Sequence, residues 1–337
     1  QQSLESQNAY KKSMSQLTGM LHIKPDVILA DSHPGYHTSL AASAYNIEHN
    51  VENLLKIQHH KAHFSAVLAE NSILNNVEPI LGIVWDGTGF GDDHQIWGSE
   101  VFLYENGDMR RLAHLKYFNH LMNDKMSREP RLSALSLLKE LPAHQHIIET
   151  YFNETEWKYY QKVLTGKPET MTSSMGRFLD GIACILGIGS IQTYEGETVM
   201  KMESLARQYI PEKETFYNFE IVNDEILYFQ FLEACIHDFI TSGNVPKICR
   251  KVFFSLARLV GQLSDHHSID RIAFSGGVFQ NAFLVDMIKK SLNGKKHLYF
   301  HAQLSPNDEC IGFGQIACYD LQKRRDKVQP LSDIAES

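Results

Sequence analysis

The stretch PILGIVWDGTGFGDD, residues 79–93, predicts the fold class more clearly than any other segment of this chain. Its apolar residues 80–85 are typical of a buried strand, and residues 86–91 are rich in glycine. The same order returns near the end of the chain, where the strand-like residues 271–274 precede SGGVFQN, residues 275–281, and then a helical pattern. Strands that alternate with helices predict an α/β fold with much of its sheet covered by helices.

The rest of the chain adds further strands and helices to this pattern. Helices are expected at residues 4–22, 38–48 and 60–74, and strands at residues 27–30 and 53–58. WGSEVFLYENGDMRRLAHL, residues 97–115, predicts a hairpin that turns at ENGD. Residues 128–260 are mostly helical in pattern, and the polar tail 322–337 is expected to be frayed.

Composition excludes several classes of protein. The chain has 337 residues, of which 43% are hydrophobic and 21% charged, which is typical of a globular protein. A net charge of −8 disfavours purely electrostatic binding to nucleic acid or to an anionic membrane. Five cysteines with no C-x-x-C pair indicate a reducing compartment. With no apolar run of membrane-span length and no signal-peptide centre, the sequence predicts a cytoplasmic protein.

Two glycine segments are candidates for a phosphate site. Residues 86–91 and 275–281 each follow an expected strand, and glycine lets backbone N–H groups approach phosphate oxygens closely. Two such loops could clamp one nucleotide between them. Neither segment is a P-loop or a G-x-G-x-x-G motif, so each taken alone is more often a tight turn.

The histidine-rich segment QHHKAH, residues 58–63, is a candidate metal site. His59 and His63 are four residues apart, so on a helix both imidazoles would point from one face. With 17 histidines, about one such pair is expected by chance, and the chain has two more, His33/His37 and His297/His301. The pair alone therefore favours ordinary surface histidines. A metal ion would need further ligands, for which Asp86 and Asp308 are the candidates.

An ordered set of motifs carries a resemblance to a known family. The motifs are ADSHPGYHTS, QHHKAH, WDGTGFGDD, IWGSE, SREP, YEGE, FSGGVFQN and SPNDECIGFGQ. Over residues 20–320 this set resembles the C-terminal carbamoyl-transfer region of HypF, the [NiFe]-hydrogenase maturation factor. The resemblance implies a two-lobed, ribonuclease H-like nucleotide-binding fold of the actin and sugar-kinase type, without its first strands. It implies an N-terminally incomplete lobe I at 1–115, lobe II at 116–305, and a return helix with a polar tail at 306–337.

The resemblance also implies the site residues. Four positions match the ligands of an iron or zinc ion: His59, His63, Asp86 and Asp308. The first three of them are also the implied catalytic residues, and His60 is left open as a substrate contact. The positions that match the nucleotide site, which would hold ATP or carbamoyl-adenylate, are Asp86, Gly87, Thr88, Gly89, Asp180, Glu195, Gly196, Gly276, Gly277 and Asn281.

The implied activity is transfer of a carbamoyl group from carbamoyl-adenylate to the C-terminal cysteine of HypE, on the route to the cyanide ligands of the hydrogenase. An adenylating domain that this sequence does not contain would supply the adenylate. Two alternatives stay open: tRNA threonylcarbamoyl transfer on the same fold, and an inactive nucleotide-binding or docking domain.

Two departures from the family pattern bear on these alternatives. The segment LMNDKMSREPRL, residues 121–132, lacks a glycine pair and a tryptophan of the family pattern, and its Arg128 and Arg131 are left open as phosphate contacts. Glu309 adds a negative charge beside Asp308, which could raise the pKa of a carboxyl group there or change the metal preference.

Overall fold

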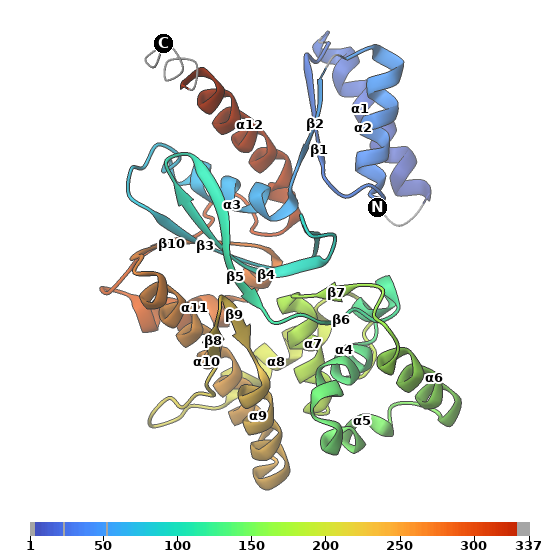
Figure 1. Cartoon of the computed structure of the whole chain (residues 1–337), viewed down its shortest axis with the longest axis vertical. Coiled ribbons are helices and arrows are strands. Elements are labelled where there is room, and N and C mark those ends of the chain that lie inside the picture. The colour runs from blue at the N-terminus through green and yellow to red at the C-terminus, as the bar shows by residue number, and fades with distance from the viewer. Residues whose placement is uncertain (1–3, 23, 52, 329–337) are drawn as a thin grey trace.

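The computed structural model describes residues 4–22, 24–51 and 53–328, which form a mixed α/β structure (Figure 1). A nine-stranded sheet has the order β11-β10-β3-β4-β5-β9-β8, with β7 paired to β4 and β6 paired to β7. The two remaining strands, β1 and β2, form a parallel sheet of their own. The strands are β1 (Val27–Asp31), β2 (Asn53–Ile57), β3 (Ile80–Phe90), β4 (Ile96–Glu105), β5 (Asp108–Leu115), β6 (Phe118–Asn119), β7 (Met171–Thr172), β8 (Glu220–Val222), β9 (Glu225–Leu227), β10 (Arg271–Ser275) and β11 (His297–Tyr299). The predicted α/β class is confirmed.

The first part of the chain leads directly into the histidine segment. It consists of α1 (Leu4–Leu21), β1, α2 (His37–His49) and β2, and β1 runs parallel to β2 with Asp31 opposite Ile57. The side chain of Gln58 then caps α3 (His59–Glu70) by accepting the N–H of Lys61. The parallel register thus places the last residue of β1 next to the first turn of α3.

The glycine segment after residue 85 is part of a strand, so the predicted open loop is wrong. β3 continues to Phe90, and its pairing with β4 shifts between Trp85 and Gly89, which marks a β-bulge. A Cβ at Gly89 would lie only 2.4 Å from Cε1 of His60. Glycine at this position therefore lets α3 pass close over β3.

The second glycine segment has the predicted order of strand, turn and helix. β10 runs parallel to β3, so the two strands end at the same edge of the sheet. A short 3-10 turn (Gly277–Gln280) and α11 (Ala282–Leu292) follow. Gly276 has φ of +102°, and a Cβ there would lie 2.2 Å from the carbonyl oxygen of Trp85. Only glycine permits this approach of the β10 turn to β3.

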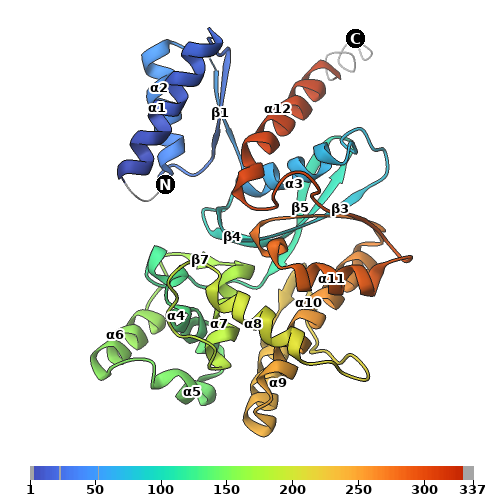
Figure 2. The same cartoon turned by 180° about the vertical axis from the view of Figure 1, so that it is seen from behind.

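Alternating side chains of β3 contribute to two hydrophobic cores. Leu81, Ile83 and Trp85 belong to the larger core, and Ile80 and Val84 belong to the smaller one. α3 and α12 (Ile311–Val328) cover the smaller core, whereas α7 (Met175–Ile185) and the helices of the middle region lie on the other face (Figures 1 and 2). The central sheet is therefore covered on both faces.

The middle region is mostly helical, as predicted for residues 128–260. Its helices are α4 (Pro130–Leu137), α5 (His146–Glu149), α6 (Glu154–Thr165), α7, α8 (Glu197–Gln208), α9 (Phe229–Ser242) and α10 (Val245–His267). The predicted hairpin is also confirmed: Asn106 and Gly107 between β4 and β5 both have positive φ, as a type I′ turn requires. No helix among the described residues is long and apolar enough to cross a membrane.

Some predicted boundaries differ from the structure. The helix expected at 60–74 ends at Glu70. The tail expected to be frayed from residue 322 is helical as far as Val328, and residues 329–337 lie outside the described residues. The nine-stranded sheet continues across residue 115, because β3–β5 pair with β10 and β9. The division of the chain into two lobes and a return helix stays a prediction.

Candidate metal and nucleotide site

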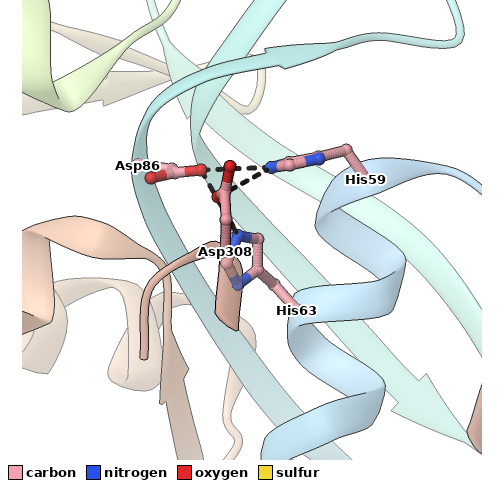
Figure 3. Close-up of side chains that lie close together, drawn as sticks. All are labelled: His59, His63, Asp86 and Asp308. Carbon is pink, nitrogen blue, oxygen red and sulfur yellow. Dashed lines mark hydrogen bonds and ion pairs between the residues drawn. The ribbon is translucent and has the colours of Figure 1, made fainter. Parts of the chain in front are cut away.

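The four predicted metal ligands meet at one point, although they come from three separate segments (Figure 3). His59 and His63 extend from α3, Asp86 from β3, and Asp308 from the short 3-10 turn Asp308–Cys310. Both imidazole Nε2 atoms lie 3.3 Å from Oδ2 of Asp86, and they lie 3.6 and 3.5 Å from Oδ1 of Asp308. The four ligand atoms all lie within 4.8 Å of one another.

The donor atoms of this cluster fit a transition-metal ion. Two imidazole nitrogens and two carboxylate oxygens form a set that zinc and iron accept. His63 Nε2 is buried and has no hydrogen-bond partner among the described residues, although it faces two carboxylate oxygens. A buried polar atom without a partner is costly, and a cation between these groups would satisfy it. Which metal is bound stays a prediction.

The charges of the cluster support one another. Burial opposes a charge on His59, but hydrogen bonds to Asp308, Asp31 and Asp86 outweigh it and raise its pKa well above the ordinary value. Burial opposes a charge on His63 too, but Asp308 and Asp86 outweigh it and raise the pKa of His63 to about 10. The two imidazoles in turn hold the pKa of Asp86 well below its ordinary value despite burial. Protons here occupy positions that a divalent cation would take on binding.

Asp31 orients His59 and was missed by the sequence prediction. Its Oδ2 lies 2.7 Å from Nδ1 of His59, and both side chains are buried. A carboxylate at Nδ1 holds the proton there, so the nitrogen that can lose its proton to a metal ion is Nε2, which faces the site. The available signal was a carboxylate at the end of an expected strand, two residues before His33 in ADSHPGYH.

His60 does not join the ligand cluster. It is fully buried, its Nδ1 lies 3.3 Å from Nε2 of Gln58, and its ring packs against Gly89. Burial and the neighbouring His59 lower its pKa well below the ordinary value, so it stays neutral. The residue that was left open as a substrate contact therefore lies inside the packing between α3 and β3.

A cavity of about 660 Å³ opens beside the cluster. Eight of the predicted nucleotide residues line it: Asp86, Gly87, Thr88, Asp180, Glu195, Gly196, Gly277 and Asn281. Gly89 and Gly276 do not line it, and their missing side chains serve the close packing described above. Because Asp86 and Asp308 line the cavity and belong to the metal cluster, the two candidate sites are continuous. The nucleotide role of these residues stays a prediction.

Arg177 is a cavity residue that the sequence prediction missed. It is buried in α7, with Nε 2.9 Å from Oδ2 of Asp180 and Nη2 3.0 Å from Oε1 of Glu195. Burial raises the pKa of Asp180 and the arginine opposes this rise. Arg177 thus holds two of the predicted nucleotide residues in place. The R-x-x-D spacing of GRFLD, which puts both side chains on one helix face, was the available signal.

Arg131 forms ion pairs with two glutamates outside the cavity. Its Nη2 lies 2.8 Å from Glu129 and 2.9 Å from Glu156, and its Nη1 donates to the carbonyl of Tyr151. Arg131 and Arg128 are both absent from the residues that line the cavity. The structure therefore gives no support for a phosphate contact by Arg131.

Comparison with known proteins identifies the family. The family model described as "Carbamoyltransferase, Kae1-like Domain, second subdomain" matches residues 82–315, which is more than half of the chain. The model described as "HypF Kae1-like domain" matches residues 1–70. Residues 71–81, which link α3 to β3 and include the first residues of β3, lie between the two matches.

Curated relatives extend this finding. Carbamoyltransferase HypF of Synechocystis sp. is 29% identical, over 91% of this chain and 42% of that protein. Probable carbamoyltransferase HypF of Methanocaldococcus jannaschii is 28% identical, over 89% of this chain and 40% of that protein. The chain thus spans about two fifths of the length of these relatives.

Solved structures agree with the sequence matches. Full-length HypF in its phosphate- and nucleotide-bound form superposes with a TM-score of 0.82 at 25% identity, over 94% of this chain and 42% of that one. HypF of T. kodakarensis gives a TM-score of 0.84 at 25% identity, over 96% of this chain and 44% of that one. The predicted HypF-type fold is confirmed. The chain belongs to the HypF carbamoyltransferase family and corresponds to its Kae1-like domain.

Proposed function

We propose that this domain transfers a carbamoyl group from carbamoyl-adenylate to the thiol of the C-terminal cysteine of HypE during hydrogenase maturation. The observation that carries the proposal is the continuity of two sites: a cluster of metal-ligand type shares Asp86 and Asp308 with the lining of a cavity of nucleotide size. The proposal concerns the transfer step alone, because the chain spans about two fifths of the length of its relatives.

The cavity offers suitable groups for each part of the adenylate. Gly87, Thr88 and Gly277 line the cavity beside Asp86, where glycine leaves room for the phosphate to approach the backbone. The Gly277 N–H donates to Oδ1 of Asp86 at 3.0 Å and so holds this carboxylate in place. Asp180, Glu195 and Asn281 line the part expected to hold the nucleoside. This order would place the carbamoyl group, which is attached to the phosphate, beside Asp86 and Asp308.

The reaction itself breaks one bond and forms one. The thiol sulfur attacks the carbamoyl carbon, the bond from that carbon to the phosphate oxygen breaks, AMP leaves, and the thiol proton passes to solvent. An iron or zinc ion held by the two histidines and two aspartates would act as a Lewis acid towards the developing negative charge. All five cysteines of this chain are buried, which supports an acceptor thiol supplied by the partner.

The two alternative functions have less support. The net charge of −8 does not favour a tRNA substrate. An inactive docking domain would have no need for two buried histidines and two carboxylates arranged around one point. The altered segment 121–132 is no argument for an inactive domain. Its Arg131 is paired with Glu129 and Glu156 and does not line the cavity, so the change in this segment does not remove a cavity residue at that position.

The test is a transfer assay with supplied carbamoyl-adenylate and a HypE-tail peptide that ends in cysteine, read by mass spectrometry. Wild type should carbamoylate the peptide, and Asp308→Ala should lower the rate on the order of 100- to 1,000-fold. The Asp308 side chain is 75% exposed, so its removal leaves the core intact. The matched control is Asp224→Ala, which removes an aspartate from a second cluster of possible metal ligands, Asp224, His266 and His267. No transfer by the metal-loaded wild type would refute the proposal, and transfer of a threonylcarbamoyl group to tRNA would favour the alternative.

A further inference from the structure

The two histidines of the cluster are supported in different ways. His59 has the carboxylate of Asp31 at its Nδ1, whereas no carboxylate among the described residues is recorded at Nδ1 of His63. The Nδ1 of His63 instead lies 3.3 Å from Oγ of Ser275, at the end of β10. The other hydrogen-bond contacts of Ser275 therefore determine how His63 is oriented.

Behind Ser275 lies a continuous series of polar contacts. Its Oγ is 2.9 Å from Nε2 of His301, and Nδ1 of His301 is 2.6 Å from Oε2 of Glu70, the last residue of α3. The side chains of His63, His301 and Glu70 are 0%, 2% and 10% exposed, and Ser275 is fully buried. Water therefore has little access to replace these contacts.

We propose that Glu70, His301 and Ser275 are positioning residues that fix the tautomer and the orientation of His63 as a metal ligand. The proposal rests on the ligand role of His63 in the proposed function. These three residues would orient His63 together, as Asp31 alone orients His59.

The direction of every hydrogen bond follows from the carboxylate. Glu70 can only accept, so His301 donates its Nδ1–H, and in the neutral imidazole a lone pair is left on Nε2. Ser275 then donates its O–H to that lone pair, and its oxygen accepts the Nδ1–H of His63. With Nδ1 fixed as the donor to Ser275, a metal that displaces the proton between Nε2 and Asp86 would meet the Nε2 lone pair of His63, which is the form that binds a metal.

Glu70 also ties the two ligand-bearing segments together. Its Oε1 accepts the backbone N–H groups of Ala302, Gln303 and Leu304 at 2.9, 2.5 and 3.1 Å. These residues begin the segment that leads to Asp308. One carboxylate thus holds the helix that carries His63 against the loop that carries another ligand.

Cys310 offers a competing explanation that the experiment must separate. Its Sγ also lies 3.3 Å from Nδ1 of His63, and 4.0 Å from Oγ of Ser275. Sulfur is a weak acceptor, and the series through Ser275 ends in a carboxylate, so we assign the Nδ1–H to Ser275. If Cys310 were the acceptor, its removal and not that of Ser275 would disturb the site.

The experiment compares Ser275→Ala with Cys310→Ala, using Zn²⁺ affinity measured by competition with a chelator and the Co²⁺ visible spectrum. Ser275→Ala should weaken Zn²⁺ binding about 10- to 100-fold and change the Co²⁺ spectrum, because partners of metal-binding histidines have effects of this size. Cys310→Ala should stay within about twofold of wild type. Circular dichroism and the urea midpoint show whether each variant is folded.

A second readout does not depend on metal. Nitrogen chemical shifts of His301 in the wild-type protein should show a proton on Nδ1 and none on Nε2. Unchanged Zn²⁺ affinity in folded Ser275→Ala would overturn the inference while leaving the proposed function intact. So would a His301 proton on Nε2. If wild type binds no Zn²⁺ or Co²⁺, the metal role in the proposed function fails, and the inference falls with it; the His301 shifts would then report only on the hydrogen-bond series.

Discussion

The buried ligand cluster and an exposed cluster made of Asp224, His266 and His267 contain the same types of residue but differ in how these are held. In both, the ligand atoms lie within 4.8 Å of one another. Asp224 lies in the turn between β8 and β9, and the two histidines end α10. The side chains of His266 and Asp224 are 46% and 60% exposed, whereas those of His59 and His63 are 2% and 0% exposed. Asp308 is the exposed member of the first cluster, at 75%, so the contrast concerns the histidines.

This difference predicts that proximity alone does not make a metal site. The exposed histidines and Asp224 would have to give up rotamer freedom to bind an ion, whereas packing already fixes the buried histidines. His266 Nε2 is 3.9 Å from Asp224, beyond hydrogen-bond range. Burial and the neighbouring His266 lower the pKa of His267, Asp224 raises it, and Arg110 lowers it again; the positive charge of Arg110 would also repel a metal cation. We therefore expect metal in the buried cluster only.

The strongest test of this comparison is Asp86→Asn. The variant should contain less than about a tenth of the metal of wild type, because it removes the negative charge that faces both imidazoles. The asparagine oxygen can still accept the Gly277 N–H, so the link between the glycine segments is kept. Elemental analysis of the purified protein is the measurement. Asp224→Asn is the matched control; if it loses metal and Asp86→Asn does not, the comparison is reversed.

Asp31→Asn tests the support of the buried cluster without changing a ligand. The amide oxygen of the new side chain could still accept a hydrogen bond from His59, but without the carboxylate charge that holds the proton on Nδ1. We expect Zn²⁺ affinity to fall about 10- to 100-fold, measured by chelator competition. A change smaller than about twofold would mean that packing alone holds His59.

Ionisation of Glu70 should make the free energy of unfolding depend on pH in the acid range. Burial opposes its ionisation, but hydrogen bonds from Gln303, Ala302 and His301 outweigh this and lower its pKa from 4.5 to about 2. A lowered folded-state pKa adds stability that is fully present above the unfolded value and is lost as pH falls through the folded value. Glu70→Gln should therefore lower the free energy of unfolding on the order of 2 kcal/mol at pH 7.

The pH series supplies the check on Glu70. In urea titrations between pH 7 and pH 3, the difference between wild type and Glu70→Gln should shrink steadily below about pH 4.5. Asp224→Asn should show no such trend, since Asp224 is 60% exposed. A constant difference across the series would show that Glu70 acts through shape and not through charge.

The sequence alone predicted the α/β class, and the ordered motifs predicted the four members of the candidate metal cluster and eight nucleotide residues that line the cavity. It could not show that Asp308 meets His59, because that contact depends on how α3, β3 and the segment before α12 pack. Glycine composition was ambiguous for a physical reason. A missing side chain serves an open phosphate loop and a close packing contact equally well, and Gly89 proved to be the second kind. Arg177 gave only the weak signal of a helical i, i+3 pair.

The smallest expected effect belongs to His266→Ala. Its side chain is 46% exposed, and a charged form would gain only a weak interaction with the C-terminus of α10. We expect the free energy of unfolding to change by less than about 0.5 kcal/mol, measured in urea, and the metal content to stay that of wild type. His63→Ala measured in parallel should lose metal, since it removes a ligand of the same type from a buried setting. If the two alanine variants lost metal to the same extent, burial would not be what separates the clusters.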